Sequence, residues 1–227
     1  MKIGALTFFF SLLIKFTFSL ENNLMIKPVF GTDQLLQLDT PYMSTNKNDL
    51  KFKTLKFYLS DIQFSYHDEI VYSDPNRFHL IDAGDESTLL IPLSIRKDAL
   101  YTTLSFTLGI DSLTSVSGVY SGDLDPMHGM YWTWQSGYIN FKLEGNCSNC
   151  QPEGKDFEFH LGGYQSPFNA MQKVSLETNG GQIHEISLDL RSFMEEVDLS
   201  RRNHIMSPCS EAVLLSKLLA KCFLVRY

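Results

Sequence analysis

The chain has 227 residues, a length that favours one large domain, or at most two, and provides ample material for a hydrophobic core. Its formal net charge is −7 at pH 7, which argues against a nucleic-acid groove, because such grooves are built from cationic contacts to phosphate. Aromatic residues make up 13% of the chain and turn-forming residues are scattered throughout, which favours strands over a helical bundle.

The N-terminus, residues 1–19, is typical of a secretory signal peptide. Lys2 precedes an apolar run over residues 3–14, and Lys15 interrupts this run before it is long enough to span a bilayer comfortably. Thr17 and Ser19 are small residues placed before a cut that would start the mature chain at Leu20. The alternative is an uncleaved membrane anchor. We expect a periplasmic or secreted protein, with residues 20–227 as a single domain and no membrane span after cleavage.

Alternating apolar residues predict many short strands in the mature chain. Residues 52–66 give the clearest pattern, because Leu55, Phe57 and Leu59 alternate before the apolar set shifts by one position. A one-residue shift moves side chains to the other face, so we expect a bulge or a crossing between sheets at residues 60–61. Further strands are predicted over residues 70–72, 78–82, 89–93, 101–110, 157–161, 174–176 and 183–190.

Turn and cap signals complete the predicted fold. Asn179, Gly180 and Gly181 predict a hairpin turn between the last two strands. Ser207 and Pro208 then predict the start of a final helix. The apolar positions of that helix are spaced for one buried face and are Ala212, Leu215, Leu218, Leu219 and Phe223. Many strands with a single terminal helix predict an all-β fold, an antiparallel β-sandwich with a short C-terminal helix.

The four cysteines are expected to be oxidised to structural disulfides in an exported chain. Cys209 and Cys222 lie thirteen residues apart on the predicted helix. At about 1.5 Å per residue this separates them by roughly 20 Å, too far for a bond with each other. Cys147 and Cys150 would close a small ring or pair outward with the helix.

The most distinctive stretch runs from residue 122 to residue 145 and contains both tryptophans of the chain. Trp132 and Trp134 are spaced as two residues on one face of a strand. The apolar positions change parity after Gly137, which predicts a bulge or bend there. Aromatic side chains in this arrangement either belong to the core or line a binding site.

The runs GDLDP and GMYWTWQSGYINFKLEG, followed by FEFHLGGYQSPFNA and HIMSP, resemble those of the MbnP-like copper-binding proteins. These are periplasmic or secreted proteins often found beside a di-haem MbnH-type partner. The resemblance covers nearly the whole mature chain, and WTWQSGY followed by HLGGY is its most specific part. It implies the same β-sandwich architecture and a copper-binding function.

The six histidines show no spacing typical of a metal site on a single strand or helix, so a metal would be held by residues from distant segments. His160 is the strongest candidate, because it ends a strand and is followed closely by Gly162 and Gly163. His204 precedes the final helix, and His128 is the histidine nearest in sequence to the tryptophans. His160 and His204 also have simpler interpretations, as a strand-end histidine facing solvent and as a polar residue near a helix cap.

The family resemblance adds a possible third donor. In the copper-binding relatives a tryptophan is oxidised to kynurenine and joins histidines around the metal. This implies a site of His160 and His204 with Trp132 or Trp134, and His128 as an alternate ligand, for Cu(I) or Cu(II). The oxidant would come from the di-haem partner.

No catalytic motif stands out, so we expect a non-enzymatic protein. The leading hypothesis is an exported protein for copper scavenging, storage or homeostasis. The alternative is a non-metal binding module in which the aromatic stretch forms an interaction surface. A third hypothesis is a structural protein whose aromatic residues are core. A copper site requires histidines and a tryptophan edge to converge, whereas a binding module requires an exposed aromatic patch.

Overall fold

A computed structural model of the chain describes residues 22–96, 99–134, 137–148, 155–178 and 183–226. The expected signal peptide, Cys150 and the turn at Asn179, Gly180 and Gly181 lie outside these residues. No helix in the described ranges is long and apolar enough to cross a membrane.

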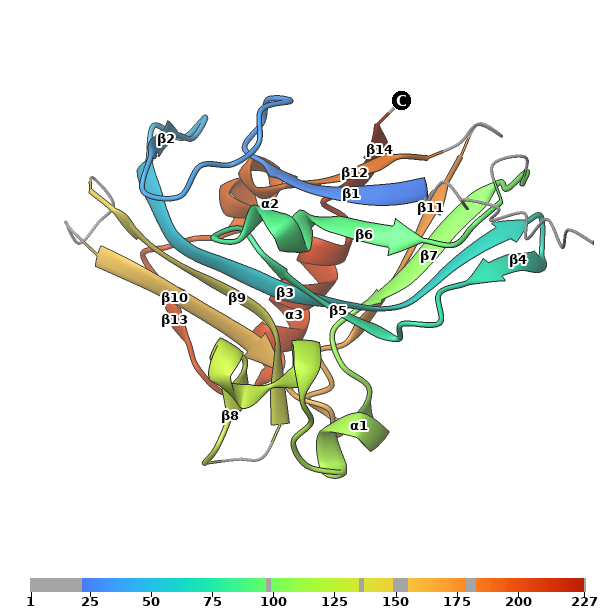
Figure 1. The fold of residues 1–227 in the computed structure, drawn as a ribbon. Coiled ribbons are helices and arrows are strands. Elements are labelled where there is room, and N and C mark those ends of the chain that lie inside the picture. Colours follow the sequence, from blue (N-terminus) through green and yellow to red (C-terminus); the bar gives the residue numbers. More distant parts are fainter. Residues whose placement is uncertain (1–21, 97–98, 135–136, 149–154, 179–182, 227) are drawn as a thin grey trace, which may run out of the picture.

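Two sheets form the body of the protein (Figure 1). The smaller sheet has the order β14 (Phe223–Arg226), β12 (Glu185–Asp189), β1 (Asn22–Val29) and β6 (Leu90–Leu93). The larger has the order β11 (Gln172–Glu177), β7 (Thr103–Leu108), β3 (Asp49–Tyr66), β9 (Gly137–Cys147), β10 (Lys155–Gly162) and β13 (His204–Ile205). Short strands β2 (Pro41–Met43), β4 (Glu69–Ser73) and β5 (Phe78–Asp82) pair with β3, and β8 (Tyr131–Trp132) pairs with β9.

The large sheet is curved, and the small sheet crosses its hollow side (Figure 1). In the part of the chain that the structure describes, the helices are α1 (Ser112–Val116), α2 (Leu190–Glu196) and α3 (Ser210–Ala220), of which α3 packs against β10 and β11. The short 3₁₀ turns there are η1 (Glu86–Leu89), η2 (Gly122–Leu124) and η3 (Pro126–His128). The predicted β-sandwich with a short helix near the C-terminus is therefore confirmed. Most strand pairs are antiparallel, but β1 pairs with β12 in parallel and β10 with β13 in parallel.

The main core fills the space inside the sandwich and follows from the alternation of apolar residues. On β3, β9 and β10 the side chains of Phe57, Phe141 and Phe159 face inward and are fully buried. Ala212, Leu215 and Leu219 of α3 join the same cluster. The inward face of each of these strands therefore stabilises the fold by burying apolar side chains.

A second, smaller core lies on the outer face of the large sheet, and we call it the outer core. Its buried residues are Tyr58, Leu80, Ile110, Leu124, Met130, Trp132, Tyr138 and Ile139. The segment from α1 to β8 covers it, at the bottom of Figure 1. Two tyrosine hydroxyls fasten this cover, because Tyr58 donates to the carbonyl of Asp123 at 3.0 Å and Tyr138 to that of Leu124 at 3.1 Å.

The parity shift in β3 is borne out as a local irregularity. The register between β3 and β7 changes between Ser60 and Gln63, and Asp61 between them has a φ of 50°. The expected hairpin between the last two strands is wrong, because β11 pairs with β7 in the large sheet and β12 with β1 in the small one. The local turn signal could not reveal that each strand finds its hydrogen-bond partners in a different sheet.

The C-terminal region also differs from expectation. α3 begins at Ser210 with Cys209 as its N-cap, and not at Ser207 and Pro208. Phe223 does not belong to the helix but lies in β14, where its ring packs 5.1 Å from that of Phe106. Cys209 and Cys222 are free thiols. They do not pair with each other, as expected, but the expectation that all four cysteines are oxidised is wrong for these two. Cys147 is disulfide-bonded.

Candidate functional site

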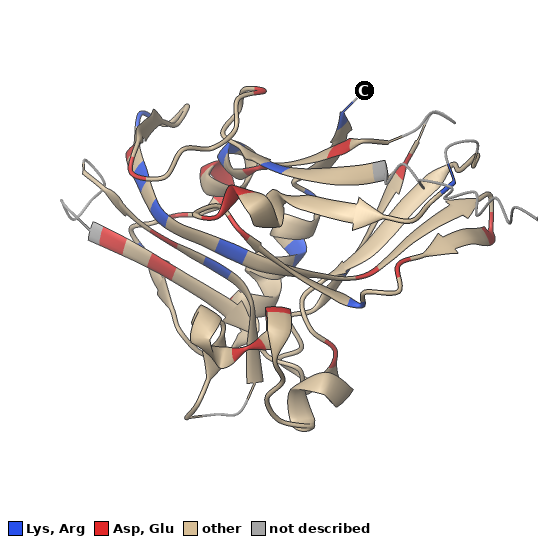
Figure 2. Ribbon diagram, in the orientation of Figure 1, with Lys and Arg blue, Asp and Glu red and all other residues tan. Residues whose placement is uncertain are grey.

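The outer face of β3, β9 and β10 carries a row of charged side chains beside the outer core, and we call this row the outer strip. The register places Lys56 opposite Lys142, and Lys142 opposite His160. These side chains alternate with the core residues and therefore point away from the core. Lys56 pairs with Asp82 at 2.9 Å and Lys142 with Glu144 at 3.3 Å. Figure 2 shows the basic and acidic bands side by side on these strands.

His160 is the best-defined candidate ligand of the outer strip. Its side chain is only 8% exposed, and its Nε2 lies 2.7 Å from Glu144 Oε1. Burial lowers the pKa of His160, although the hydrogen bond to Glu144 acts in the opposite direction. Burial by itself would raise the pKa of Glu144, but hydrogen bonds, first that from His160, lower it overall. A neutral imidazole therefore donates from Nε2 to an ionised carboxylate and keeps a lone pair on Nδ1, as metal-binding histidines do.

Trp132 lies against the same strand. It is 6% exposed and belongs to the outer core, and its ring rests on Gly162, two residues beyond His160. A Cβ at Gly162 would come within 2.8 Å of this ring, so the absence of a side chain there allows the indole to approach β10. The indole Nε1 is buried and has no hydrogen-bond partner among the described residues, which is costly for a buried donor.

Trp134 occupies a different environment, which corrects the expectation that both tryptophans share one face of a strand. The strand ends at Trp132, and Trp134 follows in a turn, 64% exposed, with its ring 5.9 Å from that of Trp132. Trp132 pairs with Gly137, so the chain reverses direction here. The change of parity near Gly137 thus reflects a reversal between two strands and not a bulge within one.

His204 lies on β13, next to β10, directly opposite Glu158. Its Nδ1 is 2.9 Å from Glu158 Oε2, and its side chain is 61% exposed. The negative charge of Glu158 also acts to raise the pKa of His160, which lies two residues along β10 on the same face. The structure therefore brings His160 and His204 to neighbouring strands on one face of the sheet, each with a carboxylate partner.

His128 lies at the edge of this region. It ends η3 and is exposed, and its Nε2 lies 3.1 Å from the carbonyl oxygen of Gly122 in its own loop. Lys56 donates to the His128 carbonyl at 3.3 Å, and Lys142 donates to that of Gly129 at 3.4 Å. The backbone of this turn is thus fastened to the outer strip, while the imidazole is engaged with the loop.

The donor set of the outer strip limits which metals it suits. Within the described ranges, no three His, Cys, Asp or Glu side chains are grouped to hold a metal ion. A metal bound at His160 and His204 would therefore need a donor of another kind. Imidazole nitrogen is a common copper ligand, and neutral histidines fixed by carboxylates are prepared for this role. Imidazole is a donor that suits copper, and a copper ion here would take its remaining donors from side chains other than His, Cys, Asp or Glu.

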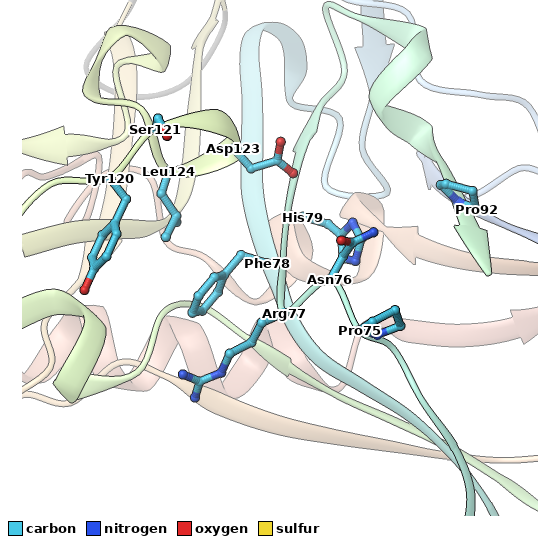
Figure 3. Close-up of a pocket in the computed structure, with 10 residues that line it drawn as sticks. All are labelled: Pro75, Asn76, Arg77, Phe78, His79, Pro92, Tyr120, Ser121, Asp123 and Leu124. Carbon is cyan, nitrogen blue, oxygen red and sulfur yellow. The ribbon is translucent and has the colours of Figure 1, made fainter. Parts of the chain in front are cut away.

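A separate pocket of about 640 Å³ lies beside β5 and was missed by the sequence analysis (Figure 3). Its wall includes His79, whose Nε2 lies 2.8 Å from Asp74 Oδ2. The side chain of Asp74 is only 1% exposed. This second buried histidine with a carboxylate partner lies five residues from Asp74 in sequence, a spacing that gives no recognised motif.

The remaining wall of this pocket is held by other contacts. Arg77 lies over the ring of Phe78, 5.1 Å from its centre, and forms ion pairs with Asp61 at 2.9 Å and Asp111 at 3.2 Å. Asp123 accepts a hydrogen bond from the backbone N–H of Leu80 at 2.9 Å. These contacts tie the cover of the outer core to the edge of β5.

Another pocket, of about 520 Å³, adjoins Trp132. Its wall combines aromatic and proline side chains with two glycines and the polar residues Gln165 and Ser166. The aromatic and proline residues are Trp132, Tyr164, Phe168, Pro167 and Pro208. Phe168 is 40% exposed. The aromatic stretch therefore contributes to both a core and an open surface.

Comparison with known proteins gives two matches. A family model described as MbnP matches residues 19–207. Among solved structures, the chain is similar to MbnP from Methylosinus trichosporium, with a TM-score of 0.52, 13% sequence identity and coverage of 79% of each chain. At this identity the likeness concerns the fold alone. Comparison with curated proteins finds no match.

Proposed function

Because this chain belongs to the MbnP family, we propose that it is an exported copper-binding protein that serves copper scavenging, storage or homeostasis outside the cytoplasm. The proposed role is binding, without catalytic activity of its own. The observation that carries it is the state of His160: a buried, neutral imidazole oriented by Glu144 on a face of the sheet that also presents His204.

His160 and His204 are the proposed imidazole ligands. The hydrogen bond from His160 Nε2 leaves Nδ1 for a metal, and the contact of His204 Nδ1 with Glu158 leaves Nε2. A bound copper ion would be coordinated by these two nitrogens and by a third donor, either a softer atom or an aromatic amine. His128 stays an alternate ligand, since its backbone is already fastened to the strip by Lys56.

Trp132 is the more suitable of the two tryptophans for a role at this site. It rests on Gly162 beside His160 and carries a buried N–H that has no partner in the described structure, whereas Trp134 is mostly exposed. Oxidation of Trp132 to kynurenine, a four-electron oxidation, would cleave the C2–C3 bond of the indole, and hydrolysis would release C2 as formate and turn the unpaired N–H into an aromatic amine. The step needs an external oxidant, which we assign to a di-haem MbnH-type partner.

Two matched substitutions test the proposal. His160→Ala removes the proposed ligand, and His79→Ala removes another buried histidine with a carboxylate partner from a different part of the fold. Loss of even an outer-shell partner lowers metal affinity by about 10–100-fold, so we expect His160→Ala to weaken copper binding by about 100-fold or more and His79→Ala to leave it unchanged. Copper would be measured by competition with a chelator on folded, purified protein.

Intact mass tests the modification. Protein taken from its export compartment should show the mass change of kynurenine, absent from Trp132→Phe and present in Trp134→Phe. Equal copper affinity in both histidine variants would disprove the assigned site. Copper binding without the mass change would keep the histidines and remove the oxidised tryptophan from the proposal.

The aromatic pocket beside Trp132 supports a second candidate function, a non-metal binding module. Tyr164, Phe168 and Trp132 offer apolar surfaces to a ligand or partner. The two functions differ in their response to copper, since a module of this kind would bind its ligand equally well in the His160→Ala variant. Absence of copper binding in either oxidation state would favour it.

A further inference from the structure

The pocket beside β5 shares no wall residue with the proposed copper site and has the size of a small-molecule site. Its volume of about 640 Å³ falls within the range of about 300–1,000 Å³ that such sites occupy. The wall is formed by residues 75–79, by Pro92 of β6 and by the part of the cover between residues 120 and 124. In Figure 3, His79 and Asp123 lie in the middle of this wall. Three segments that are distant in sequence thus border one space.

His79 is the most buried polar residue of this wall, at 9% exposed. Its Nε2 lies 2.8 Å from Oδ2 of Asp74, and the other oxygen of that carboxylate accepts the backbone N–H of Asn76 at 3.0 Å. Asp74 is therefore held in place and orients the imidazole. A neutral ring that donates from Nε2 keeps a lone pair on Nδ1, for which the described residues provide no partner. Buried polar atoms without a protein partner are rare, so this acceptor is available to a ligand in the pocket.

Four further polar groups of the wall have no hydrogen-bond partner in the parts of the chain that the structure describes. They are the side-chain amide of Asn76, the hydroxyls of Tyr120 and Ser121, and one carboxylate oxygen of Asp123. The other oxygen of Asp123 accepts the backbone N–H of Leu80, which fixes the carboxylate. The amide and the hydroxyls can both donate and accept, whereas the carboxylate and the imidazole nitrogen only accept. A ligand that carries both donors and acceptors would satisfy this set.

The charges around the pocket are mostly matched within the protein. Arg77 lines the wall but is paired with Asp61 at 2.9 Å and with Asp111 at 3.2 Å. Asp123 is the lining carboxylate that has no cationic partner among the described residues, and it would repel an anion. The pocket thus offers several hydrogen-bonding groups and a single unmatched charge. This combination favours a neutral ligand with many hydroxyls over an ion.

Tyr120 adds an apolar surface to these polar groups. The residue is 44% exposed in the pocket wall, whereas the ring of Phe78 already has the guanidinium of Arg77 5.1 Å from its centre. An aromatic ring with a hydroxyl at one end binds molecules that are themselves apolar on one side and polar on another. A pyranose sugar has this character, with C–H groups on its faces and hydroxyls around its edge.

We propose that the pocket beside β5 binds a neutral saccharide. The sugar ring packs on Tyr120, and its hydroxyls form hydrogen bonds with His79, Asn76 and Asp123. Binding is non-covalent and changes no oxidation state. This inference goes beyond the proposed copper function and does not depend on it, because no residue is shared between the two sites.

The test is saturation-transfer NMR on the mature protein with neutral saccharides as probes. The probes are the methyl glycosides of glucose, galactose, mannose and N-acetylglucosamine, together with cellobiose and maltose. We expect saturable binding of at least one probe at millimolar concentrations. Spermidine and inorganic phosphate provide a cationic and an anionic comparison and should bind more weakly. Absence of saturable binding for every saccharide would overturn the proposal.

Two substitutions of exposed residues locate the binding in this pocket. Tyr120→Phe removes only the phenolic oxygen and should weaken binding by about 2- to 10-fold, as expected for the loss of one hydrogen bond. Asn76→Ala removes the side-chain amide but keeps the backbone N–H that bonds to Asp74, and it should have an effect of similar size. Tyr66→Phe is the matched control, because Tyr66 is 42% exposed and lies outside the pocket. It should bind the probe as the wild type does.

The two buried histidines separate this proposal from the copper proposal. His79→Ala should lose saccharide binding and keep copper binding, whereas His160→Ala should do the reverse. Because removal of His79 leaves Asp74 buried without its partner and can destabilise the fold, the exposed variants Tyr120→Phe and Asn76→Ala decide the matter. Equal affinity of these two variants and the wild type would overturn the proposal. Stronger binding of spermidine or phosphate than of any saccharide would overturn it as well.

Discussion

The inner and outer faces of β3, β9 and β10 are built from alternate residues of the same strands, yet they have opposite characters. Inward, Phe57, Phe141 and Phe159 are fully buried in one apolar cluster. Outward, charged side chains pair with one another, and His160 lies among them beside Trp132. The difference shows which positions the fold requires and which are free to carry a site.

The largest loss of stability should come from removing a buried aromatic ring on the inner face. Phe159→Ala removes a ring that packs 5.8 Å from Phe157 and 6.2 Å from Phe193, and should lower the free energy of unfolding by about 3–5 kcal/mol. Glu158→Gln, the adjacent outward residue, should change it by less than about 1 kcal/mol, because its partner His204 is largely exposed. Denaturant unfolding of the metal-free proteins measures both. A similar loss in the two variants would contradict the division into two faces.

A smaller loss of stability is expected when one methyl group is added to the outer face. In Gly162→Ala, Cβ would lie 2.7 Å from the Tyr138 carbonyl oxygen and 2.8 Å from the ring of Trp132. Overpacking of this kind costs about 1–3 kcal/mol, and the indole should move outward. Tryptophan fluorescence should shift to longer wavelength.

The control for this substitution is Gly84→Ala, where the nearest atom would be 3.2 Å away and both tryptophans are remote in sequence. Its fluorescence should match that of the wild type. An unchanged spectrum in Gly162→Ala would mean that Trp132 does not depend on this glycine for its position.

The smallest effect is a pH dependence of stability that arises from His160 on the outer face. Burial lowers the pKa of His160 below its ordinary value of 6.5, so the unfolded chain binds the proton more readily than the folded one. The neutral imidazole thus makes its full contribution to the free energy of unfolding above about pH 6.5. This contribution decreases as the pH falls toward the lower pKa of His160 in the folded protein. Urea midpoints between pH 8 and pH 5 should fall more steeply in wild type than in His160→Gln. Parallel curves would refute this assignment.

Periodicity was a good guide to single strands and a poor guide to their partners. The one-residue shift in β3 was visible because side-chain parity is a local property, and it coincides with the irregularity at Asp61. The turn signal at residues 179–181 was equally local, but β11 and β12 lie in different sheets. Strand pairing depends on contacts far apart in the chain, which no short pattern records.

The candidate site shows the same limit. His160 stood out through its neighbouring glycines, and Gly162 is indeed where the Trp132 ring rests. Its carboxylate partner Glu144 did not stand out, because only the register of β9 and β10 brings the two together. The different burial of Trp132 and Trp134 depends on a chain reversal, which parity alone does not distinguish from a bulge.

The two tyrosine hydroxyls that fasten the cover of the outer core have a consequence for dynamics. They bond to backbone carbonyls of Asp123 and Leu124, and the small cluster beneath is separate from the main core. Such a region can exchange its amide hydrogens through a local opening that leaves the rest of the molecule folded. Access of solvent and small reagents to Trp132 is then governed by the free energy of that opening, and removal of a single phenolic oxygen, as in Tyr138→Phe, would speed it without altering global unfolding to the same extent.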